Sequence, residues 1–149
     1  MERLQRHAMR TVDSSANTLF PEPSLQKIFL AIYLSDEPVS LKEVSRMTGL
    51  SLASVSTKAK EMVHNGFLEK RTKPGSRELF LHTDQTLPEV VAAHTDQKLK
   101  VMRKQEQQLH QLMEEATPEE REKLDRMLED VKKVIDAQER MRRELEADA

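Results

Sequence analysis

The sequence predicts a mainly α-helical protein that contains one small β-hairpin. Three observations support this fold class. Apolar residues recur at helical spacing along most of the 149 residues, and two short alternating runs follow one of the helical segments. The three glycines, Gly49, Gly66 and Gly75, fall between these segments, where turns and helix ends are expected.

Charge is distributed unevenly along the chain. Charged residues make up 34% of the sequence, yet the formal net charge is only -2. Residues 39–82 hold eight Lys or Arg and four Glu, whereas residues 114–149 hold eight basic and thirteen acidic side chains. The middle of the chain is therefore the part that we expect to face phosphates.

Several classes of function are disfavoured by what the sequence lacks. It has no Cys, which excludes disulfides, thiolate catalysis and Cys-based metal sites. The five histidines are never three or four residues apart, and neither a Gly-rich phosphate loop nor a nucleophile motif is present. We therefore do not expect an enzyme, a cofactor or a metal site.

Membrane association is not expected either. The first ten residues lack the apolar core of a signal peptide. The longest apolar run, residues 28–34, is far shorter than the roughly 20 residues that cross a bilayer. The sequence therefore predicts a soluble, cytoplasmic protein.

The first part of the chain is expected to hold two helices. Leu4, Ala8 and Val12 give residues 2–16 a weak helical pattern, with a frayed tail as the alternative. Two prolines interrupt this pattern, and a more hydrophobic helix begins at Ser24. Apolar residues cover most of its circumference, which predicts a buried helix. Its apolar stripe consists of Leu25, Ile28, Phe29, Ile32 and Tyr33.

Two capped helices follow, joined by a tight turn. Ser40 is a good N-cap, and Glu43 three residues later is the partner it needs for a capping box. Gly49 ends this helix in a left-handed conformation, and Ser51 caps the next one. Two capped helices joined by about three or four residues that include Gly form a helix-turn-helix. The inward stripe of the second helix consists of Val55, Ala59, Met62 and Val63.

A β-hairpin is predicted directly after the second helix. Residues 67–72 form its first strand, residues 73–76 have the composition of a turn, and residues 77–82 form the second strand. A hairpin in this place makes the unit a winged helix-turn-helix. Its helix and hairpin together can straddle a DNA groove and the backbone beside it.

The last third of the sequence predicts two helices of about 30 residues each. The second of them begins at a strong start signal, Thr117-Pro118-Glu119-Glu120, and runs to about residue 145. The first begins near Leu87 and carries an imperfect heptad repeat. The members of this repeat are Val91, Thr95, Lys98, Met102, Gln105, Leu109, Leu112 and Ala116.

These two helices have apolar stripes and no globule of their own to cover them. A second copy of the same chain is the expected partner, with a non-associating helical tail as the alternative. The expected dimerisation residues are Met102, Leu109, Leu112, Leu124, Leu128, Val131 and Ile135. The chain then divides into an N-terminal helical arm at residues 1–19, a winged helix-turn-helix domain at residues 20–84 and a dimerisation arm at residues 85–149.

The residues expected to contact DNA lie on the second motif helix and on the hairpin. The N-terminal half of a recognition helix enters the major groove, where small hydroxyl side chains allow close approach and lysines reach phosphates. An arginine beside the hairpin tip suits the negative potential of a narrow minor groove. The candidates are Ser51, Ala53, Ser54, Ser56, Thr57, Lys58, Lys60, Lys73 and Arg77.

Four of the candidates also have a simpler interpretation. Ser51 serves as a helix cap whether or not DNA is bound. Lys58 and Lys60 are equally compatible with ordinary surface charge. Arg77 has a salt bridge to Glu78 as its alternative.

Residues 35–80 resemble the winged-helix core of MarR-type transcriptional regulators, and most of all the GbsR branch. The matching elements are residues 34–38, Gly49-Leu50-Ser51, Ser54-Val55-Ser56, Gly66-Phe67-Leu68 and the wing Gly75-Ser76-Arg77. The resemblance implies a homodimeric repressor or activator that binds a pseudo-palindromic operator, in some members under the control of a small molecule.

Three positions depart from the family pattern. Ser76 stands where an acidic residue often precedes the wing arginine, and Ala59 stands where Leu is usual. Leu52 and Ala53 replace a Lys-Gly pair, so the operator sequence of the family cannot be transferred to this chain.

The function predicted from these observations is sequence-specific binding of double-stranded DNA by a homodimeric transcriptional regulator. The recognition helix, residues 51–65, would enter the major groove, and the wing, residues 70–80, would lie at the minor groove. The alternative is a winged helix that serves as a protein–protein interaction module without binding DNA directly.

Overall fold

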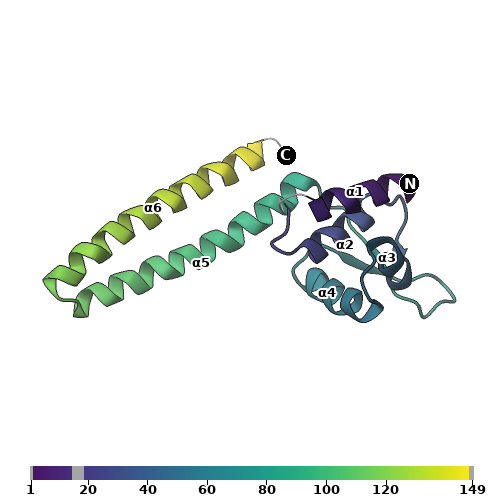
Figure 1. Cartoon of the computed structure of the whole chain (residues 1–149), viewed down its shortest axis with the longest axis horizontal. Helices are drawn as coiled ribbons and strands as arrows, with labels where there is room; N and C mark the ends of the chain where they lie inside the picture. Colours follow the sequence, from purple (N-terminus) through teal and green to yellow (C-terminus); the bar gives the residue numbers. More distant parts are fainter. Residues whose placement is uncertain (1, 15–18, 148–149) are drawn as a thin grey trace. The chain divides into compact units, whose positions relative to one another are not determined.

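The computed structural model describes residues 2–14 and 19–147, which fold into two compact units (Figure 1). Residues 1–87 belong to the first unit and residues 88–149 to the second. The described residues form six helices and one three-stranded antiparallel sheet, which confirms the predicted fold class. None of these helices is long and apolar enough to cross a membrane.

Four helices build the first unit, namely α1 (Glu2–Ser14), α2 (Pro23–Tyr33), α3 (Leu41–Thr48) and α4 (Leu52–His64). α2 lies at its centre, because α1, α3, α4 and the sheet all contact it. Figure 1 shows α1 and α4 on opposite sides of α2.

The core of the first unit is built on α2, whose Ile28 and Phe29 are fully buried, as predicted. Tyr33 differs from the prediction, because it is 39% exposed at the last turn, where it stacks on Phe29. The ring of Phe20 lies 5.3 Å from that of Phe29 and 5.1 Å from that of Phe67, measured between centroids. These aromatic contacts join the segment before α2 to the segment after α4.

α1 turns a different side to the core from the one predicted. Met9 and Gln5 are buried, whereas Leu4 is 52% exposed. The Gln5 amide Nε2 donates hydrogen bonds to the carbonyl oxygen of Ala31 at 3.2 Å and to Ser35 Oγ at 2.8 Å. A polar side chain can therefore face the core here because its donors are satisfied. The side chain of Val12 and residues 15–18 lie outside the described residues.

The start of α3 follows half of the predicted capping box. Ser40 Oγ accepts a hydrogen bond from the N–H of Glu43 at 3.2 Å. The Glu43 carboxylate bonds the Arg46 guanidinium, and this bond lowers the pKa of Glu43. The cap therefore stabilises the helix start, while Glu43 serves an ion pair on the surface of α3.

The sheet contains one strand that the sequence analysis missed. β1 (Val39–Ser40) pairs with β3 (Phe80–His82), which also pairs with β2 (Glu69–Arg71), so the strand order is β1-β3-β2. Val39 lies opposite Leu81 in this register, and both side chains are buried. A strand of two residues is too short to show the alternating pattern by which strands are recognised.

The two hairpin strands are also shorter than predicted. Phe67 and Leu68 do not belong to β2, because their N–H groups donate to the carbonyl oxygen of Met62 and close the end of α4. Both side chains are buried. The connection between the strands covers residues 72–79, so the wing has a longer loop than the sequence indicated.

The second unit is a hairpin of α5 (Leu87–Glu115) and α6 (Pro118–Ala147). Thr117 N–H donates to Glu120 Oε2 at 3.0 Å, and Glu120 N–H donates to Thr117 Oγ1 at 3.3 Å. The predicted capping box at the start of α6 is therefore confirmed in both directions.

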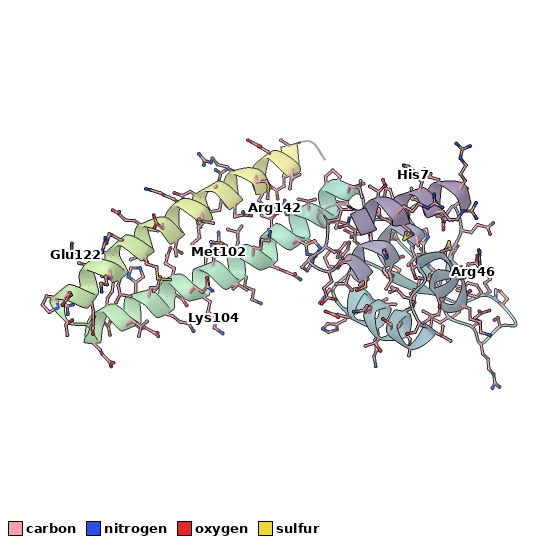
Figure 2. All side chains as sticks on the ribbon, in the orientation of Figure 1. His7, Arg46, Met102, Lys104, Glu122 and Arg142 are labelled. Carbon is pink, nitrogen blue, oxygen red and sulfur yellow. The ribbon has the colours of Figure 1, made fainter. Side chains whose placement is uncertain are left out.

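Ion pairs connect the two antiparallel helices α5 and α6. Arg103 lies 2.5 Å from Glu139, and Arg142 Nε lies 2.8 Å from Asp96 Oδ1. The hydrogen bond that Arg142 donates to the Asp96 carboxylate raises the pKa of Arg142. Figure 2 shows Arg142 and Met102 between the two helices and Lys104 on the outer side of α5.

The apolar contacts inside the hairpin depart from the predicted heptad repeat. Leu99 is buried in α5, whereas Lys98, which the repeat contained, is exposed. Gln105 and Leu112 of the same repeat are exposed as well. α5 is oriented about its axis so that the apolar side chain of Leu99, and not the neighbouring Lys98, is buried. Leu109 of α5 and Leu128 and Ile135 of α6 are buried as well.

Candidate nucleic-acid interface

The inner side of α4 fixes the rotation of this helix. Val55, Ala59 and Met62 are at most 2% exposed, as the sequence predicted. Burial of these three side chains stabilises one orientation of the helix about its axis. That orientation decides which residues of α4 face solvent.

The outer side of α4 consists of small side chains. Ala53, Ser56 and Thr57 are exposed, and Ser54 is partly buried. Thr57 Oγ1 donates to the carbonyl oxygen of Ala53 at 3.0 Å, which fixes the threonine side chain along the helix. A second body can therefore approach the first turns of α4 closely.

Both ends of α4 are held by hydrogen bonds. Ser51 Oγ accepts from the N–H of Ser54 at 3.1 Å, which confirms its predicted role as the cap. At the other end Gly66 has a φ of 83°, and the N–H of Phe67 donates to the carbonyl oxygen of Met62 at 2.9 Å. These bonds use backbone groups that a helix end leaves without partners.

The turn between α3 and α4 fixes how the two helices meet. Gly49 has a φ of 75°, and a Cβ at this position would meet nothing within 4 Å. Backbone conformation alone therefore demands glycine here. Ser45 accepts the N–H of Gly49 with its carbonyl oxygen at 3.0 Å and donates from Oγ to the carbonyl oxygen of Leu50 at 2.6 Å.

Two lysines of α4 differ in their surroundings. Lys58 Nζ lies 3.2 Å from Glu22 Oε2, so this lysine already has an anionic partner in the first unit. Lys60 is exposed and has no ion pair with any residue that the structure describes. Lys60 is therefore the more available of the two for a phosphate.

The tip of the wing is basic and fully exposed. Ser76 N–H donates to the carbonyl oxygen of Lys73 at 3.1 Å, and Gly75 has a φ of 79°. Lys73 Nζ lies 4.3 Å from the centroid of the Phe80 ring, a cation–π contact that folds this lysine over the wing. Arg77 is exposed, and within residues 2–14 and 19–147 it forms no ion pair, so the alternative bridge to Glu78 is not found there.

The base of the wing is balanced in charge. Arg71 of β2 lies 3.0 Å from Glu69 and 3.8 Å from Asp84. His82 Nε2 lies 2.8 Å from Asp84 Oδ1. Arg71 and His82 thus have acidic partners at the base of the wing, whereas Lys70 of β2 is exposed and has no ion pair with any residue that the structure describes.

Leu52 is a surface residue that the sequence analysis did not count as a candidate. It is the first residue of α4 and is 46% exposed. At 100° per residue it lies only about 60° from Val55, which assigns it to the core side. An apolar side chain here can contact a thymine methyl group.

Three comparisons with known proteins bear on this geometry. The family model of the IclR helix-turn-helix domain matches residues 27–72, a range that begins within α2 and ends just after β2. YvaV of Bacillus subtilis (strain 168), provisionally named as an HTH-type transcriptional regulator, is 26% identical over 145 residues, covering 91% of this chain and 82% of its own. OpcR of the same organism, an HTH-type transcriptional repressor, is 25% identical over 142 residues. This alignment covers 89% of this chain and 77% of OpcR.

One solved structure has a similar fold. A crystal structure of a transcriptional regulator superposes with a TM-score of 0.59 at 16% identity and covers 92% of this chain and 91% of its own. The domain match and the two relatives together define the class of this protein. It is a helix-turn-helix, sequence-specific DNA-binding transcriptional regulator rather than an enzyme.

Proposed function

We propose that the protein acts as a homodimeric regulator of the MarR type, GbsR branch, in which each chain reads one half-site of an operator. α4 enters the major groove and the wing, residues 70–80, lies at the adjacent minor groove. The observation that carries the proposal is the outer side of α4, which combines small side chains with the absence of acidic residues from Ser51 to Lys60.

The chemistry of the first turns of α4 suits the major groove. Exposed Ser56 and Thr57 donate to or accept from base edges and phosphates, while Ala53 and Leu52 offer apolar contact to thymine methyl groups. The positive end of the helix dipole points the same way as Ser51 and favours a phosphate nearby. The predicted DNA contacts of Ser51, Ala53, Ser54, Ser56 and Thr57 thus stay in the proposal.

Basic residues then position the protein on the backbone. Arg77 suits the narrow minor groove because it is exposed at the tip of the wing and carries a full positive charge. Lys60 and Lys73 lie within the same basic segment and suit phosphates. Lys58 joins them by exchanging its exposed partner Glu22 for a phosphate, which costs little because surface ion pairs contribute about 0–1 kcal/mol.

The homodimer and its setting complete the proposal. Two recognition helices about one helical turn of DNA apart, about 34 Å, require two copies of this chain on a pseudo-palindromic site. The second unit offers the apolar surface for joining them.

A small-molecule effector of unknown identity is a further expected partner. We propose a cytoplasmic location, since the ligand is chromosomal DNA.

The test is a titration of labelled duplex DNA by the full-length chain at about 50 and 200 mM salt, a range in which phosphate-dependent binding weakens strongly. Arg77→Ala should weaken binding and reduce the salt slope by about 2, because the homodimer loses one cation from each of its two wings. Lys104→Ala removes a cation from the outer side of α5 and serves as the control. If both variants bind like the wild type, the wing assignment is wrong. If the wild type does not bind duplex DNA at either salt concentration, the proposal fails and the protein–protein interaction module is favoured.

A further inference from the structure

α1 turns a basic side towards solvent. Arg3, Arg6, His7 and Arg10 are all exposed, and residues 3–12 contain no acidic side chain. We call these four residues the arginine face. At 100° per residue they fall within an arc of about 100° around the helix. The arginine face is therefore one continuous surface rather than scattered charge.

Contacts with α2 fix the direction of the arginine face. Gln5 and Met9 are buried, and Gln5 Nε2 donates to the carbonyl oxygen of Ala31 in α2 at 3.2 Å. The midpoint between these two buried residues lies about 80–180° around the helix from the four members of the face. Figure 2 shows His7 on the side of α1 away from the rest of the first unit. The folded chain therefore presents the face without any rearrangement.

The arginine face has the chemistry of a phosphate-binding surface. Arg3 and Arg10 form no ion pair within the part of the chain that the structure describes. An open hollow of about 710 Å³ lies against the four members and Leu4. A guanidinium binds a phosphate through two parallel N–H bonds, which a lysine ammonium does not. Phosphate groups of a larger ligand thus suit this surface.

We propose that the arginine face binds the phosphate backbone of a second DNA segment, so that one regulator holds two segments together. This rests on the proposed function, in which α4 and the wing occupy the first segment. α1 and α4 lie on opposite sides of α2 (Figure 1). Packed helices are about 8–10 Å apart, so the axes of α1 and α4 are separated by about 16–20 Å. A straight duplex on the outer side of α4 therefore leaves the arginine face uncovered.

Spacing and composition favour a nucleic-acid strand over other occupants. The seven residues from Arg3 to Arg10 cover about 10.5 Å of helix, the length of about three phosphates along one DNA strand. Among the described side chains of α1, Leu4 is the only large apolar one that is exposed. A protein partner or a bilayer surface would need a larger apolar contact. The expected binding is therefore electrostatic, independent of base sequence and sensitive to salt.

The experiment captures a second duplex on a complex that already contains the first. An operator obtained by genome-wide mapping is immobilised, saturated with the full-length protein and washed. A short labelled duplex of unrelated sequence is then added at about 50 and 200 mM salt. The wild type should capture this duplex at the lower salt and release it at the higher. Arg3→Ala combined with Arg10→Ala should lower the capture at least about fivefold and change operator affinity less than about twofold.

Two control variants separate the arginine face from the rest of the surface. Lys104→Ala combined with Lys132→Ala removes two charges from exposed positions of the second unit and should capture like the wild type. Arg77→Ala should weaken operator binding and leave the capture per bound chain unchanged. Circular dichroism checks that every variant keeps its helix content. Native mass spectrometry should find two chains in complexes that contain both duplexes.

The outcomes separate this inference from the function on which it rests. A wild type that does not bind the operator would contradict both. A wild type that binds the operator but captures no second duplex, or a double arginine variant that captures it normally, would overturn the inference alone. Two duplexes held by four chains would place the bridge between regulators and overturn it as well. Capture of phosphatidylglycerol vesicles in place of the duplex would assign the face to lipid and reject the second DNA segment.

Discussion

The two units differ in how far their large apolar side chains are buried. In the first unit Ile28, Phe29 and Val55 are fully buried, and the outer side of α4 is small and polar. In the second unit Leu112 and Met127 are more than half exposed on a hairpin that carries its own internal contacts. The first unit completes its core within one chain and leaves small and polar side chains on the outer side of α4. The second unit leaves large apolar side chains exposed to solvent.

Removing a large core side chain should have the largest effect, and only in the first unit. Phe29→Ala should lower the free energy of unfolding by about 3–5 kcal/mol, because the ring is fully buried, contacts Phe20 at a tilt and stacks on Tyr33. Val134→Ala should change the free energy of unfolding of the monomeric chain by less than about 0.5 kcal/mol, because its side chain is exposed. Urea denaturation at low protein concentration measures both. Equal losses would show that the two units do not differ as described.

Removing a helix cap from each unit should have a smaller effect on stability than Phe29→Ala, and it also compares the functions of the two units. Ser51→Ala and Thr117→Ala each remove a side-chain acceptor at a helix start and should each cost about 1 kcal/mol in thermal unfolding. Their functional effects should differ. Ser51→Ala should weaken DNA binding because it loosens the first turn of α4, whereas Thr117→Ala should affect dimer stability more than the intrinsic affinity of one half-site. A reversal of these two effects would contradict the division of roles.

The smallest effect concerns the pH dependence of the second unit. Burial, and to a lesser extent the charge of Lys98, lower the pKa of His94 below its ordinary value of 6.5. The unfolded chain then binds more protons than the folded one below pH 6.5, so stability should fall as the solution is acidified through and below that pH. His94→Gln should reduce this slope in melting temperatures measured from pH 8 to pH 5. His110→Gln changes an exposed residue of the same helix and is the control. Identical slopes for all three proteins would remove His94 as the cause.

How much of this could be predicted from the sequence depends on how local the deciding interaction is. The Ser51 cap, the capping box at Thr117 and the left-handed Gly49 involve neighbours in sequence, and the structure confirms all three. The inward side of α4 was predictable as well, because three apolar residues share one helical face.

Other features depended on partners far along the chain. Gln5 faces the core because Ala31 and Ser35 accept its amide hydrogens, which no pattern within α1 reveals. β1 exists because β3 offers it an edge some 40 residues later. Leu99 rather than Lys98 is buried because α6 decides which face of α5 is covered. The exposure of Leu112 and Met127 could be recognised only once these internal contacts were known.

The most direct test of the whole account is the composition of the protein–DNA complex. Genome-wide mapping of occupied sites supplies an operator, and the mass and footprint of the full-length protein on that duplex are then measured together. The account predicts two chains on one duplex, with two protected segments centred about one helical turn, or 34 Å, apart. A single chain that protects one segment at saturation, with no second copy joining at any concentration, would contradict it.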